Sequence, residues 1–105
     1  MGEPIRFTDN VLRCPICEFN CTSHYATTVY ERDSEDSEFG FVTRCEHGET
    51  HTVARKNFLG SINMRANPSS RRDGLSIEFE CERCDGFILH FAQHKGETIV
   101  TVDAI

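Results

Sequence analysis

Alternating apolar and polar residues mark the C-terminal third of the chain. In residues 75–80, leucine, isoleucine and phenylalanine alternate with serine and glutamate, so the apolar side chains fall on one face of an extended strand. Further strand-like runs at residues 87–92 and 98–102 flank the polar residues 94–97, in which Gly96 can adopt the positive φ of a tight turn. The pattern predicts a half-buried strand followed by a C-terminal β-hairpin.

Shorter runs of apolar and β-branched residues predict more strands in the first half of the chain. They lie at residues 5–12, 24–30, 39–43 and 51–54. The one helix candidate, around residues 55–64, is interrupted by Gly60 and lacks an apolar stripe. Two polar segments predict exposed loops: the acidic residues 31–38, and residues 67–74, which close on an Asp-Gly turn signal. We therefore expect a mainly β, antiparallel domain.

The composition suits a small domain that needs support beyond its apolar core. The 105 residues are enough for one domain, residues 1–105, but 38% are apolar and none is tryptophan, so eight phenylalanines must supply much of the burial. No apolar run is long enough to cross a bilayer, and the first residues lack the basic and apolar blocks of a signal peptide. These features predict a soluble cytoplasmic protein, in which six cysteines favour metal ligation over disulfides.

Charge is distributed unevenly along the chain. The net charge of −6 opposes general binding to nucleic acid, because such binding neutralises phosphates with surplus lysine and arginine. Residues 44–72 nevertheless carry six basic and two acidic groups, between acidic segments at residues 1–43 and 73–105. The middle of the chain could therefore form a local basic surface.

Two Cys-x-x-Cys pairs are the strongest chemical signal. Cys14 and Cys17 follow the first predicted strand, and Cys81 and Cys84 lie between two later ones. Zinc prefers thiolates in a tetrahedron, and each such turn aims two sulfurs at one point about 2.3 Å away. The context suits metal-binding turns, or knuckles, at the tips of hairpins, with Gly86 allowing a left-handed backbone that points amides at sulfur. We predict one structural Zn²⁺ site formed by these four cysteines.

Two alternatives use the same cysteines. An iron–sulfur site has the same ligands, so the choice of zinc or iron stays open at the level of the sequence. A thioredoxin-like redox pair is disfavoured, because neither a βαβ pattern nor a helix N-terminus adjoins either motif.

A second group of potential ligands lies between the two pairs. Its members are Cys21, His24, Cys45, His47 and His51. A second metal site there is left open, but small buried cysteines and structural histidines are the commoner outcome for such residues. We expect Cys21 and Cys45 to be buried.

A catalytic zinc site finds little support. Residues 47–49, His-Gly-Glu, followed by the second cysteine pair have a superficial likeness to the motifs of zinc deaminases. However, Glu80 stands where their proline belongs, the first cysteine pair is unexplained, and the helices that carry such a site are not predicted. Four thiolates also leave zinc no open position for water. We predict a protein that is not an enzyme.

Several motifs form a recognisable set. They are residues 14–17, the acidic stretch that follows, residues 67–75, the second cysteine pair and residues 94–96. Together they resemble a family of small zinc-ribbon proteins encoded by bacteriophages and prophages, and the likeness is strongest after residue 67. It implies a zinc-ribbon-like fold with a long insertion between the knuckles, the same four cysteine ligands, and a hairpin turn at residues 93–96. The family has no settled activity, and its pattern does not assign Cys21 or Cys45.

Two functions are compatible with these observations. The first is a non-enzymatic, zinc-stabilised binding module, encoded by a phage, that acts on a host protein as regulator or inhibitor of a defence or nucleic-acid enzyme. The alternative is a nucleic-acid-binding zinc ribbon that uses the basic segment 44–72, with Arg65, Arg71 and Arg72 on phosphates. The arginines of the loop at residues 67–74, here called the arginine loop, could instead pair with the acidic residues 31–38. The oligomeric state is left open.

Overall fold

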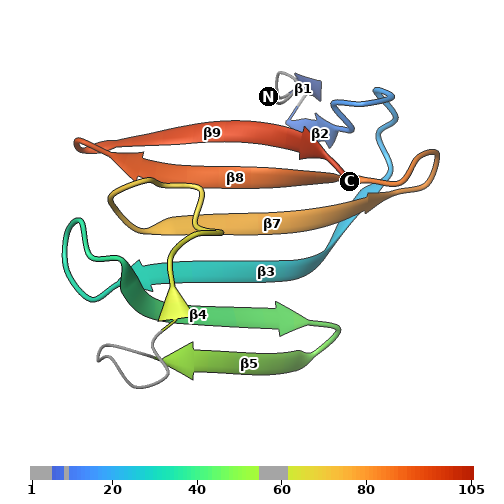
Figure 1. Cartoon of the computed structure of the whole chain (residues 1–105). Helices are drawn as coiled ribbons and strands as arrows, with labels where there is room; N and C mark the ends of the chain where they lie inside the picture. The colour runs from blue at the N-terminus through green and yellow to red at the C-terminus, as the bar shows by residue number, and fades with distance from the viewer. Residues whose placement is uncertain (1–5, 9, 55–61) are drawn as a thin grey trace.

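The computed structural model describes residues 6–8, 10–54 and 62–105, and these contain nine strands and no helix (Figure 1). The strands are β1 (Arg6–Thr8), β2 (Val11–Arg13), β3 (Thr22–Arg32), β4 (Phe39–Glu46), β5 (Glu49–Ala54), β6 (Ile62–Asn63), β7 (Gly74–Cys81), β8 (Phe87–His94) and β9 (Glu97–Ala104). The expectation of a mainly β, antiparallel protein is confirmed. Within the same residues there is no helix that could span a membrane.

One large antiparallel sheet dominates the fold. Its strands follow the order β5-β4-β3-β7-β8-β9, and the short β6 pairs with β4, while β1 and β2 form a separate two-stranded sheet. Most neighbours in the large sheet are also neighbours in sequence, as expected for hairpins. The exceptions are the short pairing of β6 with β4 and the long pairing of β3 with β7, which runs from Thr22 opposite Cys81 to Tyr30 opposite Gly74. The β3–β7 pairing joins the first half of the chain to the C-terminal β7-β8-β9 meander.

The C-terminal hairpin forms where the turn signal predicts it. Pairing of β8 with β9 begins at His94 opposite Glu97, so that a two-residue turn connects the strands. Lys95 has φ 52° and Gly96 has φ 83°. Two successive positive φ values are the mark of a type I′ turn, whose twist matches that of the flanking strands.

One local expectation is wrong, and one weak candidate is contradicted where the structure describes it. Residues 5–12 are not one strand: β1 and β2 form a small hairpin, and Asn10 at its turn has φ 69°, which an asparagine tolerates better than most residues. The weak helix candidate around residues 55–64 is contradicted at its C-terminal end, where Ile62 and Asn63 form β6 against β4. Residues 55–61 lie outside the described part of the chain.

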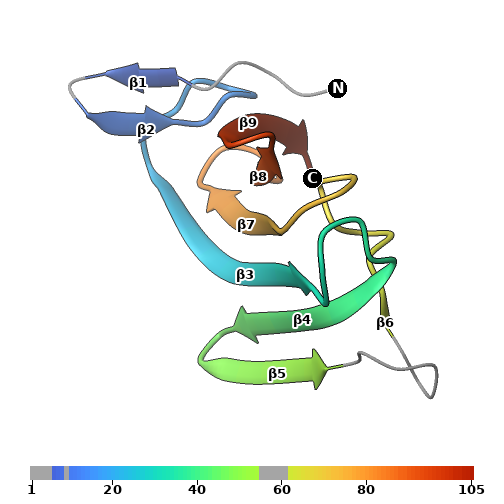
Figure 2. The same ribbon diagram turned by 90° about the vertical axis from the view of Figure 1, so that its left-hand side faces the viewer.

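The buried core lies between the N-terminal segment and one face of the β7-β8-β9 meander. Its centre consists of Cys14, Cys81, Phe87, Leu89 and Val102. Leu12, Phe19, Phe79 and Phe91 are among the partly buried side chains around it. The rings of Phe79 and Phe87 stack with centroids 4.8 Å apart. Figure 2 shows the β1–β2 hairpin as a separate layer on the β9 side of the sheet. Cysteines therefore belong to the apolar core itself.

Candidate metal centre

The first knuckle is a tight turn that follows β2. The backbone N–H of Cys14 donates to the carbonyl of Phe19 at 2.8 Å, and the N–H of Glu18 donates to the carbonyl of Cys14 at 2.7 Å. These two bonds close the loop and leave Glu18 with φ 66°. The expectation that both knuckles sit at hairpin tips is wrong here, because this turn connects β2 to β3, which belong to different sheets.

The second knuckle is the tip of the β7–β8 hairpin, as expected. Cys81 ends β7, and Gly86 immediately precedes β8 with φ 104°. A Cβ atom on Gly86 would lie 2.2 Å from the carbonyl oxygen of Phe79. Both the backbone conformation and the close approach therefore require glycine at this position.

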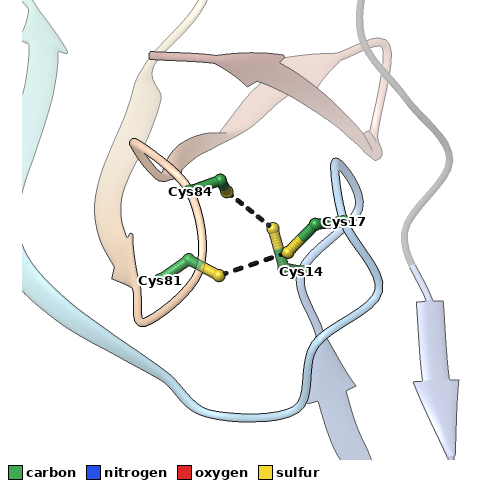
Figure 3. Close-up of side chains that lie close together, drawn as sticks. All are labelled: Cys14, Cys17, Cys81 and Cys84. Atoms are coloured by element: carbon green, nitrogen blue, oxygen red, sulfur yellow. Dashed lines mark hydrogen bonds between the residues drawn. The ribbon is translucent and has the colours of Figure 1, made fainter.

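The two knuckles face each other and bring four sulfur atoms together (Figure 3). The Sγ atoms of Cys14, Cys17, Cys81 and Cys84 all lie within 4.8 Å of one another. The Sγ–Sγ distance is 3.5 Å between Cys14 and Cys84 and 3.4 Å between Cys17 and Cys81. A tetrahedron with metal–sulfur bonds of about 2.3 Å has edges of about 3.8 Å, whereas a disulfide needs about 2.05 Å. The spacing suits a shared metal ion and excludes disulfides between these pairs.

The electrostatics of the cluster also favour a cation among the sulfurs. Burial opposes ionisation of Cys81, but the backbone N–H groups of Arg83 and Cys84 and the neighbouring thiols outweigh it, and the pKa of Cys81 falls to about 7. At Cys84 the Gly86 N–H favours the thiolate, yet burial and the other thiols together raise the pKa to about 12. The Cys81 thiol thus ionises readily, whereas ionisation of the Cys84 thiol is disfavoured. Four thiolates side by side need a positive ion to hold them.

Packing ties this centre to its surroundings. The Cys14 side chain is completely buried, and that of Cys81 nearly so. The guanidinium of Arg83, from the second knuckle, lies 4.2 Å from the ring centroid of Phe19, which follows the first. This cation–π contact links the two turns. The four cysteines predicted from sequence are therefore the four that the fold assembles, and they fit a metal with sulfur preference.

The expected burial of Cys21 and Cys45 is wrong, because both side chains are exposed. Cys21 precedes β3 and contacts the side chain of Asn20. Among the described side chains, no cluster of three or more potential metal ligands includes Cys21, His24, Cys45 or His47. His47 instead stacks on Tyr25, with centroids 6.0 Å apart.

His24 likewise has an aromatic neighbour, since its ring meets Phe79 edge-on at 6.3 Å. The side chain of His51 lies outside the described set. The described residues therefore support the one metal centre, formed by the two cysteine pairs.

Arg71 and Arg72, which were proposed for phosphate contacts, have acidic neighbours. Arg71 forms an ion pair with Asp36, and Arg72 pairs with Glu35 at 2.9 Å. The hydrogen bond from Arg71 lowers the pKa of the Asp36 carboxyl, so this group stays ionised. Arg65 is exposed beside a cavity of about 540 Å³. The pairing of the arginine loop with the acidic loop is thus the arrangement found.

A hydrogen-bonded chain of Ser76, His90 and Asp103 was not expected. Ser76 Oγ lies 2.8 Å from His90 Nδ1, and His90 Nε2 lies 3.1 Å from Asp103 Oδ2. The residue types are those of a hydrolytic triad, but Ser76 is only 7% exposed, so a substrate carbonyl cannot reach its hydroxyl. The alternation pattern of β7, β8 and β9 places all three on one face, but their pairing depends on strand register. We interpret this row of hydrogen bonds between Ser76, His90 and Asp103 as a structural feature.

Comparisons of this chain with known proteins identify no relative. No protein-family model matches the chain, and no curated protein or solved structure matches it significantly. Function therefore rests on the geometry described above.

Gly86→Ala should destabilise the protein more than the same change at another left-handed glycine. We expect a loss of about 3 kcal/mol in unfolding free energy, because backbone strain and the clash with Phe79 add. Gly96→Ala is the matched control: it also has positive φ, but its added Cβ meets nothing within 4 Å, so about 1 kcal/mol is expected. Urea denaturation of both variants measures the difference. Equal losses would refute the close approach at Gly86.

Cys21→Ala and Cys45→Ala should each leave the metal content unchanged. Both side chains are exposed and lie outside the four-sulfur cluster, so the unfolding free energy should change by less than about 0.5 kcal/mol. Elemental analysis of the purified variants checks this, with Cys17→Ala as the variant that should lose metal. Reduced metal in either exposed-cysteine variant would revive a second site.

Proposed function

We propose that the four cysteines hold one structural Zn²⁺ ion and make the chain a zinc-ribbon-like module. The single observation behind this proposal is the cluster of four sulfurs at near-tetrahedral spacing, part of which lies inside the apolar core. Thiolates suit zinc, and four of them fill its coordination shell, so no position remains for a reacting water. The role assigned to the ion is to lock the N-terminal segment onto the β7-β8-β9 meander.

Loss of one zinc ligand should unfold the protein. Structural zinc sites contribute on the order of 10 kcal/mol to folding. This is more than the net unfolding free energy expected of a chain with so small a core. We expect one zinc per chain in the purified protein, and Cys81→Ser to be unfolded or aggregated by circular dichroism. Cys45→Ser, an exposed position, is the control and should stay folded. Iron with charge-transfer absorption, or a folded Cys81→Ser variant without metal, would contradict the zinc proposal.

We infer further that the module is not an enzyme and binds a protein. A four-sulfur centre with no open ligand position supports this, as does the burial of Ser76 in the triad-like group of Ser76, His90 and Asp103. The resemblance to phage-encoded proteins makes that partner a host protein, which the module would regulate or inhibit. Net charge −6 directs it toward a basic surface on that partner rather than toward phosphate.

The best candidate for the binding surface is a pair of loops, residues 33–38 and 67–73, here called the loop surface. Arg32 joins the two loops: its Nε donates to the carbonyl of Arg72 at 2.8 Å, and its Nη2 donates to the carbonyl of Ser69 at 2.7 Å. A further guanidinium bond reaches the carbonyl of Ser37. These bonds pre-organise the loops, which reduces the entropy lost on binding.

The alternative, a nucleic-acid-binding ribbon, needs Arg71 and Arg72 to exchange their present partners. Asp36 and Glu35 occupy positions that phosphates would have to take. Exposed ion pairs are individually weak, so such an exchange is chemically feasible, but the acidic groups would remain beside the phosphates and repel them. This local repulsion adds to that of the whole molecule.

The protein should therefore show no saturable binding to duplex or single-stranded DNA at about 150 mM salt, where charges are screened beyond roughly 8 Å. Fluorescence anisotropy over a salt series measures this. A double variant Glu35→Gln, Asp36→Asn releases both arginines from their acidic partners and tests whether pairing conceals a phosphate site. Saturable binding by the wild type, with a log-log salt slope near −0.9 per contact and loss in Arg71→Glu, Arg72→Glu, would overturn the protein-partner proposal.

Affinity purification from a bacterial lysate, followed by mass spectrometry, tests the protein-partner proposal directly. We expect a stoichiometric partner with the wild type that is lost when Glu35 and Asp36 are both changed to lysine. Glu49→Lys, an exposed acid away from the loop surface, is the matched control and should keep the partner. Retention of the partner by both variants would place the binding surface elsewhere.

A further inference from the structure

A cavity of about 540 Å³ lies between the two loops of the loop surface. Figure 1 shows the segments that hold these loops, after β3 and before β7, side by side at one end of the sheet. Phe39, Met64 and Pro68 give the cavity apolar walls. Met64 is only 5% exposed and Phe39 is 37% exposed, so apolar surface extends from the protein interior to the mouth of the cavity. Cavities of this size with apolar walls and a few polar groups are the usual form of a binding site.

Hydrogen bonds hold the walls of this cavity in place. The side-chain amide of Asn67 donates to the carbonyl of Arg72 and accepts from the N–H of Ser69, each at 2.9 Å. Ser69 Oγ donates to the carbonyl of Gln93 at 2.8 Å, and the Ser69 carbonyl accepts from Arg32. Asn67 and Ser69 are both buried, so these bonds are shielded from water. The cavity is therefore formed before any ligand arrives, which lowers the entropy lost on binding.

Charge at the mouth of the cavity favours a basic group beside the ligand. Glu38 lines the cavity and is exposed, and no ion pair involves it among the side chains that the structure describes. Its acidic neighbours Glu35 and Asp36 already pair with arginines. Arg32 and Arg65 also line the cavity, but the Arg32 guanidinium donates to three loop carbonyls and Arg65 has an interaction of its own. The carboxylate of Glu38 is thus the charge that a ligand can neutralise.

We propose that the cavity receives one large apolar side chain from an exposed segment of the partner protein, and that a lysine or arginine next to this side chain pairs with Glu38. The inference rests on the proposed protein-binding function and names the chemistry of the partner's contact segment. An apolar anchor that fills a pocket supplies most of the binding energy at such interfaces. The ion pair at the rim contributes less energy, and it selects segments with a basic residue beside the anchor.

Met64 provides a direct readout, because Met1 is the other methionine of the chain. The intact purified protein is labelled at its methionine methyl groups, and the variant Met64→Leu assigns the two NMR signals. The capped peptide Gly-Phe-Lys-Gly should shift the Met64 signal saturably. Its relative Gly-Gly-Lys-Gly lacks the anchor and should bind more than about tenfold more weakly. Gly-Phe-Glu-Gly reverses the charge and should bind about fivefold more weakly.

Glu38→Lys tests the assigned ion pair. This variant should bind the Phe-Lys peptide about fivefold more weakly than the wild type does, and it should come to prefer the Phe-Glu peptide. Glu31→Lys is the matched control, because it makes the same charge change at an exposed acid that does not line the cavity. It should leave both affinities unchanged. A wild type that prefers the Phe-Glu peptide, or equal effects of the two variants, would overturn the role of Glu38.

The remaining outcomes separate this inference from the proposed function. A Met64 signal that ignores the Phe-Lys peptide at millimolar concentration would overturn the inference, even if the wild type captures a partner that the Glu35→Lys, Asp36→Lys variant loses. A Met64 signal that moves with protein concentration alone would assign the cavity to a second copy of this chain and would also overturn it. If the peptide series binds as expected but no partner is captured, the cavity inference stands and the host-protein proposal fails.

Discussion

Four sulfur atoms from turns more than sixty residues apart in the chain lie within 4.8 Å of one another, and the proposed structural role of a metal ion depends on this close approach. Cys14 and Cys81 are also members of the buried core, so side chains that pack the core are also placed where they could hold a metal ion. The short β1–β2 hairpin is a separate two-stranded sheet and does not belong to the large one. Because a two-stranded hairpin is marginal in water, its attachment to the meander relies on this centre and on the apolar contacts around it.

The pairing of β3 with β7 is the second constraint, and it decides what the rest of the surface presents. It closes the long insertion between the knuckles and brings the end of β3 beside the start of β7. Arg32, at that end of β3, can then bond to both adjacent loops, and Arg71 and Arg72 meet Asp36 and Glu35. The two arginines at the end of the basic stretch are thereby neutralised locally, and this supports the proposal of a protein partner rather than phosphate.

Sequence reasoning succeeded where a signal was local. Alternation in residues 75–80 and the glycine turn near residue 96 predict β7 and the β8–β9 hairpin because side-chain period and backbone φ are properties of neighbouring residues. It failed where tertiary context decides. Cys21 and Cys45 have ordinary apolar character, yet no described layer covers them. The β1–β2 turn and β6 involve strands of two or three residues, too short to show a period.

The sequence by itself determined the chemistry of the metal centre, since two Cys-x-x-Cys turns supply four soft ligands whatever lies between them. It also determined the β character and the C-terminal turn. The tertiary structure alone decided how strands meet: that β3 pairs with β7, that Arg71 and Arg72 meet acidic side chains, and that Ser76, His90 and Asp103 form one hydrogen-bonded chain. Strand register is set by contacts between distant residues, and a shift of one residue would turn every side chain to the other face.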